Sequence, residues 1–279
     1  MPQLVARAVP GTLLFRTNEE ARALWNRLVS MFPEALSLCL MPNHVHLDLP
    51  HEDPSGNLSV VMRAYALWRN HHRGARGAVW EPRPEVRTPE DGDHARRLRR
   101  YTLLNPCRGK LTTDPLTWAW ASHRDLLGLA RTPLIERVRD DEYHHSWVSS
   151  DYSTDTGGTA LPRTHWGYTD WGMVVDAVCA VTRTFAYEVQ NRGPARTLAV
   201  KTAWAHGLRD VAQLAAAVGL LRRAVNDIVE GVPARGADFA DPVLAACVRV
   251  VGDSRFSALA TGDLRRTEQW MRSKYRGLK

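Results

Sequence analysis

The chain of 279 residues has few cysteines and no long apolar run. Its four cysteines stand far apart and form no Cys-x-x-Cys pair, which argues against zinc ribbons and against a dense disulfide framework. Dispersed thiols are typical of a reducing cytoplasm. No stretch approaches the roughly 20 apolar residues that cross a bilayer, and the first residues lack the basic start and apolar core of a secretory signal. We therefore expect a cytoplasmic protein without membrane insertion.

Several catalytic motifs are missing as well. The sequence contains no Gly-x-x-x-x-Gly-Lys, no Gly-x-Ser-x-Gly and no His-Glu-x-x-His, so nothing in it supports nucleotide hydrolysis, α/β-hydrolase chemistry or zinc proteolysis. Acidic residues are outnumbered, with 37 Lys and Arg against 30 Asp and Glu and a net charge of +7. Such a balance attracts polyanions, nucleic acid first, although it also serves plain solubility.

The first part of the chain alternates short β-type segments with amphipathic helices. One strand with a break at Pro10-Gly11 is expected over 2–8 and 11–16. Two short strands are expected over 35–40 and 44–49, on either side of a hairpin or tight turn at Met-Pro-Asn. Helices are expected over 18–32, 55–72 and 90–104. We expect Asn18 to cap the first helix and Asn105-Pro106 to stop the third. The order β-α-β-β-α-α predicts an α+β fold, with a small antiparallel sheet and helices on one face.

The pattern changes in the second half. Residues 148–170 collect Ser, Thr, Gly and Asp and are expected to form a linker or an exposed loop. From Trp171 onward the pattern is wholly helical, with helices expected over 171–187, 194–206, 208–216, 221–230, 241–251 and 263–275. We therefore divide the chain into an α+β domain over 1–130, a connecting segment over 131–170 and an all-α domain over 171–279.

Two histidines occupy a strand where aliphatic residues would be usual. His44 and His46 lie in the expected strand 44–49, and residues two apart on a strand share a face. The residues between them point to the core, so the histidine face would be open to ligand or solvent. Two imidazoles on one strand can bind one divalent metal ion, with Asp48 as a third ligand or as a solvent-facing carboxylate. The simpler interpretation is two histidines on the wet face of an edge strand.

A candidate third ligand lies some sixty residues further on. Tyr101 and Asn105 are four residues apart in a helical segment and therefore share a face. The amide oxygen of Asn105 suits a hard cation such as Mg²⁺ or Mn²⁺, and the Tyr101 phenol can act as a nucleophile. The arginines that precede them and could hold phosphates are Arg96, Arg97, Arg99 and Arg100. The simpler interpretation packs Tyr101 in the core and leaves Asn105 as a helix end.

Three segments together resemble the REP-associated tyrosine transposases, which belong to the single-tyrosine HUH nuclease superfamily. In order and at similar spacing they are MPNHVHL at 41–47, YTLLNPCRGKL at 101–111 and WAWASHRDLLG at 118–128. The resemblance covers roughly residues 1–128 and implies a ferredoxin-like, RRM-like nuclease core. It implies His44, His46 and Asn105 as the ligands of Mg²⁺ or Mn²⁺.

The resemblance also implies an activity. Tyr101 would cleave single-stranded, hairpin-bearing repeat DNA, leaving a 5′-phosphotyrosine and a free 3′-hydroxyl, and a second 3′-hydroxyl could reverse the step and join strands. The metal would keep positions open for phosphate oxygens, and Arg108, which matches a motif position, would join the other arginines at the DNA. The tyrosine would come from its own chain or from the partner subunit of a homodimer. Candidates for base stacking, with core packing as the alternative, are Trp68, Trp80 and Trp118.

Three positions depart from the family pattern. Asp48 stands where an apolar residue is usual, Ala121 replaces the first serine of the W-x-W-S-S run, and His123 stands where tyrosine is common. These departures bear on substrate preference rather than on the chemistry.

The stretch 208–231 has the pattern of a helix, a turn at Gly219 and a second helix. With its upstream helix, roughly 171–231, it resembles the C-terminal DNA-binding domain of the replication initiator DnaA. The resemblance implies that the helix from Leu221 enters a major groove, where the residues nearest the DNA would be Arg222, Arg223 and Asn226. A plain helical bundle is the alternative. A basic tail that could grip phosphate or be solvated contains Arg265, Arg266, Arg272, Lys274, Arg276 and Lys279.

Two other functions compete with the transposase-like nuclease. A catalytically silent DNA-binding regulator would keep the fold without the chemistry, and the intact set of His44, His46, Tyr101 and Asn105 argues against it. A relaxase or replication-type nicking enzyme is the second alternative. The sequence has no helicase motif and no second tyrosine near Tyr101, which argues against the large rolling-circle initiators. The expected partner in each case is DNA, and the expected location is the cytoplasm, at the nucleoid.

Overall fold

A computed structural model of the chain describes residues 1–51, 56–131, 137–154, 156, 160–191, 193–233 and 235–259. Contacts divide them into two compact units. The first contains Met1–Leu126 and the described residues of Thr132–Thr159, and the second contains Leu127–Arg131 and the described residues of Ala160–Gly262. None of the described helices is long and apolar enough to cross a membrane.

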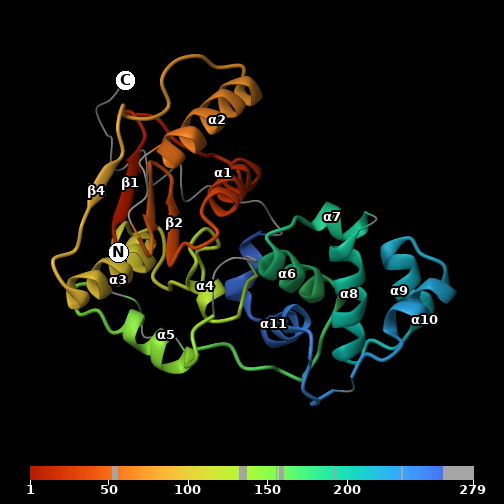
Figure 1. Cartoon of the computed structure of the whole chain (residues 1–279). Coiled ribbons are helices and arrows are strands. Elements are labelled where there is room, and N and C mark those ends of the chain that lie inside the picture. The colour runs from red at the N-terminus through yellow and green to blue at the C-terminus, as the bar shows by residue number, and fades with distance from the viewer. Residues whose placement is uncertain are drawn as a thin grey trace. The chain divides into compact units, whose positions relative to one another are not determined.

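The first unit is built on an antiparallel sheet of four strands in the order β2-β3-β1-β4 (Figure 1). The strands are β1 (Gln3–Arg7), β2 (Ser37–Met41), β3 (His44–Asp48) and β4 (Glu85–Arg87). Strands β2 and β3 confirm the expected hairpin around Pro42-Asn43, with Met41 opposite His44. The short strand β4 is not among the strands that the sequence predicts.

The strand expected over 11–16 is wrong. The chain there forms turns and bends, starting at Gly11 with a φ of 78°. Side chains take the place of a strand partner, because Arg69 Nη2 donates to the Leu13 carbonyl at 2.6 Å and the Tyr65 hydroxyl donates to the Leu14 carbonyl at 2.7 Å. Its backbone acceptors are therefore satisfied without a ladder.

Helices lie on both faces of the sheet, so the expectation of helices on one face is wrong. Helices α1 (Asn18–Met31) and α2 (Gly56–Arg73) pack together on the side away from α3 (Gly92–Arg108) (Figure 1). Hydrogen bonds place α3 over the histidine-bearing face, since Gln3 Nε2 donates to Thr102 Oγ1 at 2.8 Å. That face is therefore partly covered rather than open.

The N-cap of helix α1 lies one residue earlier than the sequence suggested. Its N-cap is Thr17, whose hydroxyl accepts from the Glu20 N–H at 3.2 Å, while the Glu20 carboxylate accepts from the Thr17 N–H at 3.3 Å. This reciprocal pair is a capping box. Asn18, the expected cap, is buried and accepts a hydrogen bond from Trp120 Nε1 at 2.9 Å.

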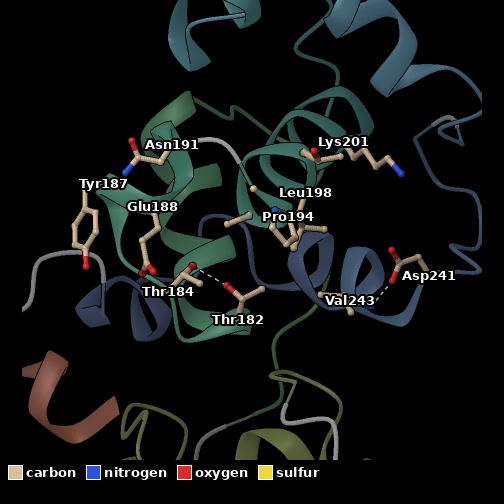
Figure 2. A pocket seen from close by; sticks show the side chains of 13 residues that line it. Thr182, Thr184, Tyr187, Glu188, Asn191, Pro194, Leu198, Lys201, Asp241 and Val243 are labelled. Atoms are coloured by element: carbon tan, nitrogen blue, oxygen red, sulfur yellow. Dashed lines mark hydrogen bonds between the residues drawn. The ribbon is translucent and has the colours of Figure 1, made fainter. Parts of the chain in front are cut away.

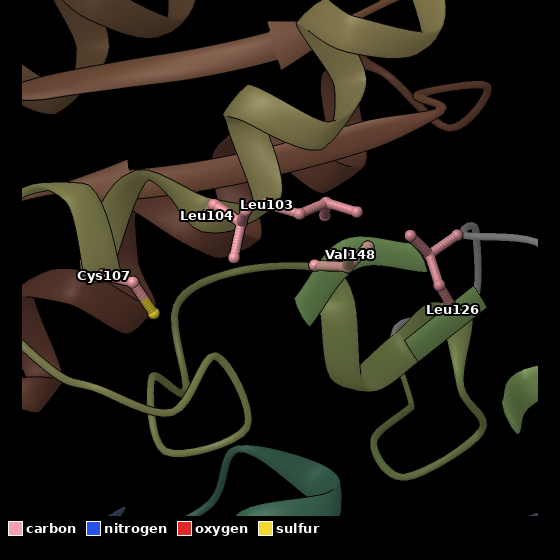
Figure 3. Close-up of a cluster of buried hydrophobic side chains, with 5 residues drawn as sticks. All are labelled: Leu103, Leu104, Cys107, Leu126 and Val148. Carbon is pink, nitrogen blue, oxygen red and sulfur yellow. The ribbon is translucent and has the colours of Figure 1, made fainter. Parts of the chain in front are cut away.

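Helix α3 continues through Pro106 to Arg108, beyond the stop expected at Asn105-Pro106. A proline in the last turn removes one N–H, and tertiary packing compensates for the lost bond. The buried side chains of Leu103, Leu104 and Cys107 form a cluster with Leu126 and Val148 (Figure 3). Leu126 belongs to α4 (His123–Leu126) and Val148 to α5 (Asp141–Ser149), two helices that the sequence pattern did not reveal.

The WAWAS segment at 118–122 lies along the outer edge of β2. The Leu40 N–H donates to the Trp120 carbonyl and the Ser122 N–H donates to the Leu38 carbonyl, both at 2.8 Å. Trp118 Nε1 also donates to the Leu40 carbonyl, at 2.9 Å. These bonds satisfy an edge that would otherwise expose unpaired backbone groups.

The described elements of the second unit are helical. They are α6 (Trp171–Thr182), α7 (Ala186–Gln190), α8 (Pro194–Ala205), α9 (Val211–Val218), α10 (Arg222–Val229), α11 (Pro242–Val250) and the 3₁₀ helix η1 (Ser254–Leu259). The single helix expected over 171–187 is divided, because Arg183 takes a left-handed conformation with a φ of 52°. The helix expected over 263–275 and the basic tail lie outside the described residues.

Candidate active site

Strand β3 and helix α3 bring the four predicted site residues together. The ring centroids of His44 and His46 are 4.8 Å apart, and those of His46 and Tyr101 are 5.4 Å apart. His44 Nε2 lies 3.2 Å from Asn105 Oδ1. His46 thus contacts Tyr101 and His44 contacts Asn105, although some sixty positions separate the strand from the helix in sequence.

The contacts of His44 fit a cation beside it. Its Nδ1 lies 2.7 Å from Asn43 Oδ1, and its Nε2 lies 3.2 Å from Asn105 Oδ1. A neutral imidazole has only one N–H. If that proton is on Nδ1 and donated to Asn43, the Nε2 lone pair faces another acceptor oxygen. A nitrogen and an oxygen whose lone pairs face each other can both coordinate one divalent cation.

His46 lies deeper than His44. Its side chain is 2% exposed, and its Nδ1 is buried without a hydrogen-bond partner among the described residues. Burial holds the pKa of His46 well below its usual value, and the charges of His44, Arg87 and Arg7 lower the pKa further. The ring is therefore neutral at pH 7 and keeps a lone pair for a metal ion.

The buried carboxamide of Asn105 supports the same interpretation. The side chain is 4% exposed, and its Nδ2 has no hydrogen-bond partner among the described residues. Its oxygen is the atom directed at His44. Burying an amide nitrogen without a hydrogen-bond partner costs free energy. A strong interaction at the amide oxygen would offset that cost.

Tyr101 is half-buried beside the histidines and is not part of the apolar core. The edge of one ring meets the face of the other in its contact with His46, at an interplanar angle of 74°. The guanidinium carbon of Arg108 lies 4.9 Å from the centroid of the Tyr101 ring. A phenol held between an imidazole and a cation has a fixed position, which a nucleophile needs.

Asp48 is neither a third metal ligand nor a solvent-facing carboxylate. It is 6% exposed, and it accepts hydrogen bonds from Gln3 Nε2 at 3.0 Å and from the Ser37 hydroxyl. Burial raises the pKa of the Asp48 carboxyl. Among the residues that the structure describes, no three His, Cys, Asp or Glu side chains gather in a way that could hold a metal ion. A metal site here would consist of two imidazoles and one carboxamide.

The four arginines before Tyr101 occupy different environments. Arg96 and Arg97 are exposed. Arg99 donates to the Leu36 carbonyl at 3.1 Å, and burial lowers its pKa. Arg100 lies 3.9 Å from the Asp151 carboxylate. The exposed pair is thus directed to solvent, whereas Arg99 and Arg100 interact within the unit.

Arg108 shares the Asp151 carboxylate with Arg100, at 3.6 Å. It also donates to the Ser153 hydroxyl at 2.9 Å. Two of the candidate DNA-binding arginines are therefore tied to the segment that follows α5.

The tryptophans considered for base stacking are mostly buried. Trp80 is 9% exposed and Trp118 is 8% exposed. Trp68 stacks on His72 at 5.0 Å and lies under the guanidinium of Arg27. In Trp80 and Trp118, packing accounts for most of the side-chain surface.

In the second unit, the predicted DNA-contacting residues lie on one short helix. Leu221 precedes α10, and Arg222, Arg223 and Asn226 are exposed on it. Helix α9 ends at Gly219, whose φ of 62° makes the sharp turn into α10. The buried face of α10 carries Val225. Helices α9 and α10 together therefore have a polar outer face and an apolar inner face.

A cavity of about 770 Å³ lies elsewhere in the second unit, along α7, α8 and the start of α11 (Figure 2). Its charged lining residues are Glu188, Lys201 and Asp241. The hydroxyls of Thr182 and Thr184 are hydrogen-bonded to each other at 2.7 Å. None of the predicted site residues lines it.

The sequence reasoning missed three residues on the histidine-bearing face: Arg7, Glu85 and Arg87. Glu85 binds both arginines, at 2.6 Å in each case. The alternation of β1 could have revealed Arg7, because Val5 and Arg7 share a face in that strand. Nothing comparable marked β4.

Comparison with known proteins adds one partial likeness. No protein-family model matches the sequence, and no curated protein matches it. A solved structure of the REP-associated tyrosine transposase bound to a REP hairpin is similar to this chain. The similarity covers 50% of this chain and 92% of that chain, with 17% sequence identity and a TM-score of 0.38. The roles of individual residues therefore depend on the site geometry.

Proposed function

We propose that the chain is a metal-dependent endonuclease and strand transferase for hairpin-bearing single-stranded DNA, with Tyr101 as its nucleophile. The observation that carries the proposal is the convergence of His44, His46, Asn105 and Tyr101 at the contact of β3 with α3. A phenol beside a metal-ligand set is an arrangement suited to phosphoryl transfer.

We infer a ferredoxin-like core for the first unit. The order β1-α1-β2-β3-α2-β4 with the sheet order β2-β3-β1-β4 supports this inference. In such a fold β3 is a central strand, which gives the two histidines a rigid base. Preorganised groups on rigid elements lower the cost of reaching the transition state.

His44, His46 and Asn105 would hold Mg²⁺ or Mn²⁺. When bound, the cation neutralises charge on the scissile phosphate. The Tyr101 oxygen forms the new bond to phosphorus while the bond from phosphorus to the 3′ oxygen breaks, giving a 5′-phosphotyrosine and a 3′-hydroxyl. The phenol gives up its proton and the leaving 3′ oxygen takes one up. The bond count is conserved, so another 3′-hydroxyl can reverse the step and join strands.

We also propose that α9 and α10 bind duplex DNA, with Arg222, Arg223 and Asn226 at the major groove. The exposed polar face of α10 and its buried Val225 support this. We further propose that Tyr101 acts at the site of its own chain, which its ring contact with His46 supports.

The test is a covalent adduct. A labelled hairpin-bearing single strand is incubated with the protein and Mn²⁺, and the products are separated on a denaturing gel. We expect a protein–DNA band that EDTA, Tyr101→Phe and His46→Ala each abolish. The matched control is Tyr143→Phe, which changes an exposed tyrosine of α5 and should leave the band intact. Cleavage that persists in Tyr101→Phe would remove the assigned nucleophile. DNA binding without cleavage under any divalent cation would favour a DNA-binding regulator.

A further inference from the structure

A row of charged side chains continues the histidine-bearing face across β1 and β4. Arg7 of β1 lies opposite His44 of β3, and Val5 lies opposite both His46 and Glu85. Residues that are opposite each other in antiparallel strands point to the same face. Arg7 and Glu85 therefore share the face of the two histidines, and so does Arg87, which is two residues beyond Glu85.

Glu85 holds the two guanidinium groups in place. Arg7 Nη1 donates to Glu85 Oε2 at 2.6 Å, and Arg87 donates through Nε at 2.6 Å and through Nη2 at 3.3 Å. A guanidinium has five N–H donors. Glu85 uses one donor of Arg7 and two of Arg87, so both groups keep donors for a further acceptor.

The row is accessible and carries net positive charge. The side chains of Arg7, Glu85 and Arg87 are 39%, 40% and 35% exposed. The hydrogen bonds from Arg87 and Arg7 lower the pKa of Glu85 to about 2. The carboxylate is therefore ionised at pH 7, and the three groups together carry one positive charge.

The row lies next to the candidate active site on the same face of the sheet. Arg7 is the cross-strand neighbour of His44. A chain of phosphates that passes Tyr101 along this face would therefore come close to both guanidinium groups.

We propose that Arg7 and Arg87, aligned by Glu85, bind backbone phosphates of a single-stranded polynucleotide next to the bond that Tyr101 attacks. The proposal rests on the proposed function and states on which side of the candidate active site the bound polynucleotide lies. The two arginines are phosphate-binding residues, and Glu85 is a positioning residue. Arginine suits this role because its planar fork meets phosphate oxygens through paired hydrogen bonds.

The alternative is an ion-pair cluster that only joins β1 to β4. The two interpretations differ in salt dependence. A phosphate-binding arginine contributes about 1 to the slope of log affinity against log salt, whereas a structural ion pair contributes nothing to that slope.

The experiment measures binding of a fluorescently labelled single-stranded oligonucleotide by anisotropy, in EDTA, over a range of salt concentrations. We expect Arg7→Gln/Arg87→Gln to weaken binding about tenfold at low salt and to lower the slope by about 2. Each single variant should lower the slope by about 1, which keeps the test available if the double variant does not fold. The matched control is Arg63→Gln, an exposed arginine of α2, with an unchanged slope.

The outcomes separate the two levels of inference. Suppose that the wild-type protein binds the oligonucleotide and forms the Tyr101 adduct, but the folded double variant keeps its affinity and slope. The phosphate-binding row is then wrong, and the proposed function stands. A wild-type protein that neither binds the single strand nor forms the adduct overturns both. A variant with reduced affinity, reduced slope and native circular dichroism supports the row.

Discussion

Glu20 is the buried charge whose removal has the most predictable effect on the first unit. Its side chain is 4% exposed, and its carboxylate accepts from the backbone N–H groups of Arg16 and Thr17. The carboxylate also accepts a hydrogen bond from Arg73 Nη2 at 2.6 Å. The Arg73 side chain is 13% exposed. The substitution Glu20→Gln keeps the shape of the side chain and removes its charge.

The expected loss of unfolding free energy follows from the contacts that Arg73 keeps in the variant. Without the carboxylate, the hydrogen-bond acceptors left to the Arg73 guanidinium among the described residues are the Leu13 and Leu14 carbonyls, each at 3.4 Å. Removing one partner of a buried ion pair costs about 3–5 kcal/mol. The partial exposure of Arg73 reduces this, and the glutamine oxygen can still cap α1, so we expect a loss of about 2–3 kcal/mol. With a urea m-value of about 1–3 kcal/mol/M, the unfolding midpoint should fall by about 1–2 M.

The pH dependence gives a second readout. Burial raises the pKa of Glu20, but the hydrogen bonds from Arg73, Arg16 and Thr17 outweigh it and leave the pKa below its usual 4.5. The folded chain therefore holds the proton less tightly than the unfolded chain. The stability that the carboxylate contributes is present above pH 4.5 and is lost as the pH falls through the folded pKa. Glutamine does not titrate, so the difference between wild type and variant should shrink in acid.

The assay is urea denaturation followed by circular dichroism at pH 7 and at pH 3.5, with hydrogen exchange of α1 to assign the transition to the first unit. The control is Glu19→Gln in the same first turn, where the side chain is exposed. It should cost no more than about 0.3–1 kcal/mol, the contribution of a charge at a helix N-terminus. Equal losses in the two variants, or a difference that stays constant in acid, would refute the reasoning.

Two more predictions concern the packing around α3. Leu104→Ala empties a fully buried position in the cluster of Figure 3 and should lower the free energy of unfolding by about 2–4 kcal/mol, whereas Leu67→Ala at an exposed position of α2 should change it by less than about 0.5 kcal/mol, both by urea denaturation. Burial, Arg99 and His145 lower the pKa of His144 to about 4, so its neutral ring contributes stability above pH 6.5 that is lost as the pH falls toward 4. The urea midpoint of His144→Phe should therefore fall less steeply over that range, and parallel curves would contradict the assignment.

Periodicity located the elements whose faces are regular. The hairpin of β2 and β3 follows from two apolar runs on either side of Pro42-Asn43. Helix α1 follows from buried residues at helical spacing, such as Leu24 and Leu28. In these segments, the side chains that pack against the rest of the unit repeat with the period of the element itself, so a single sequence contains the information.

Long-range contacts decided the positions that periodicity got wrong. Asn18 is a good cap in isolation, but Trp120, a hundred residues away, takes its side-chain oxygen and leaves the cap to Thr17. Asp48 looked like a ligand or a solvated charge, and its true partners are Gln3 on β1 and Ser37 on β2. Strand β4 has three residues and exists because β1 offers an edge. No local pattern contains these partners.

The candidate site depends on a match between two different repeats. Residues two apart on a strand are separated by about 6.7 Å along its axis, and residues four apart on a helix by about 6 Å. A strand and a helix packed against each other can therefore align two pairs of side chains at once. His46 meets Tyr101 and His44 meets Asn105 in this way. The spacings His-x-His and Tyr-x-x-x-Asn are thus one geometric requirement expressed in two elements, and inserting one residue in either element would separate the phenol from the candidate metal-binding residues.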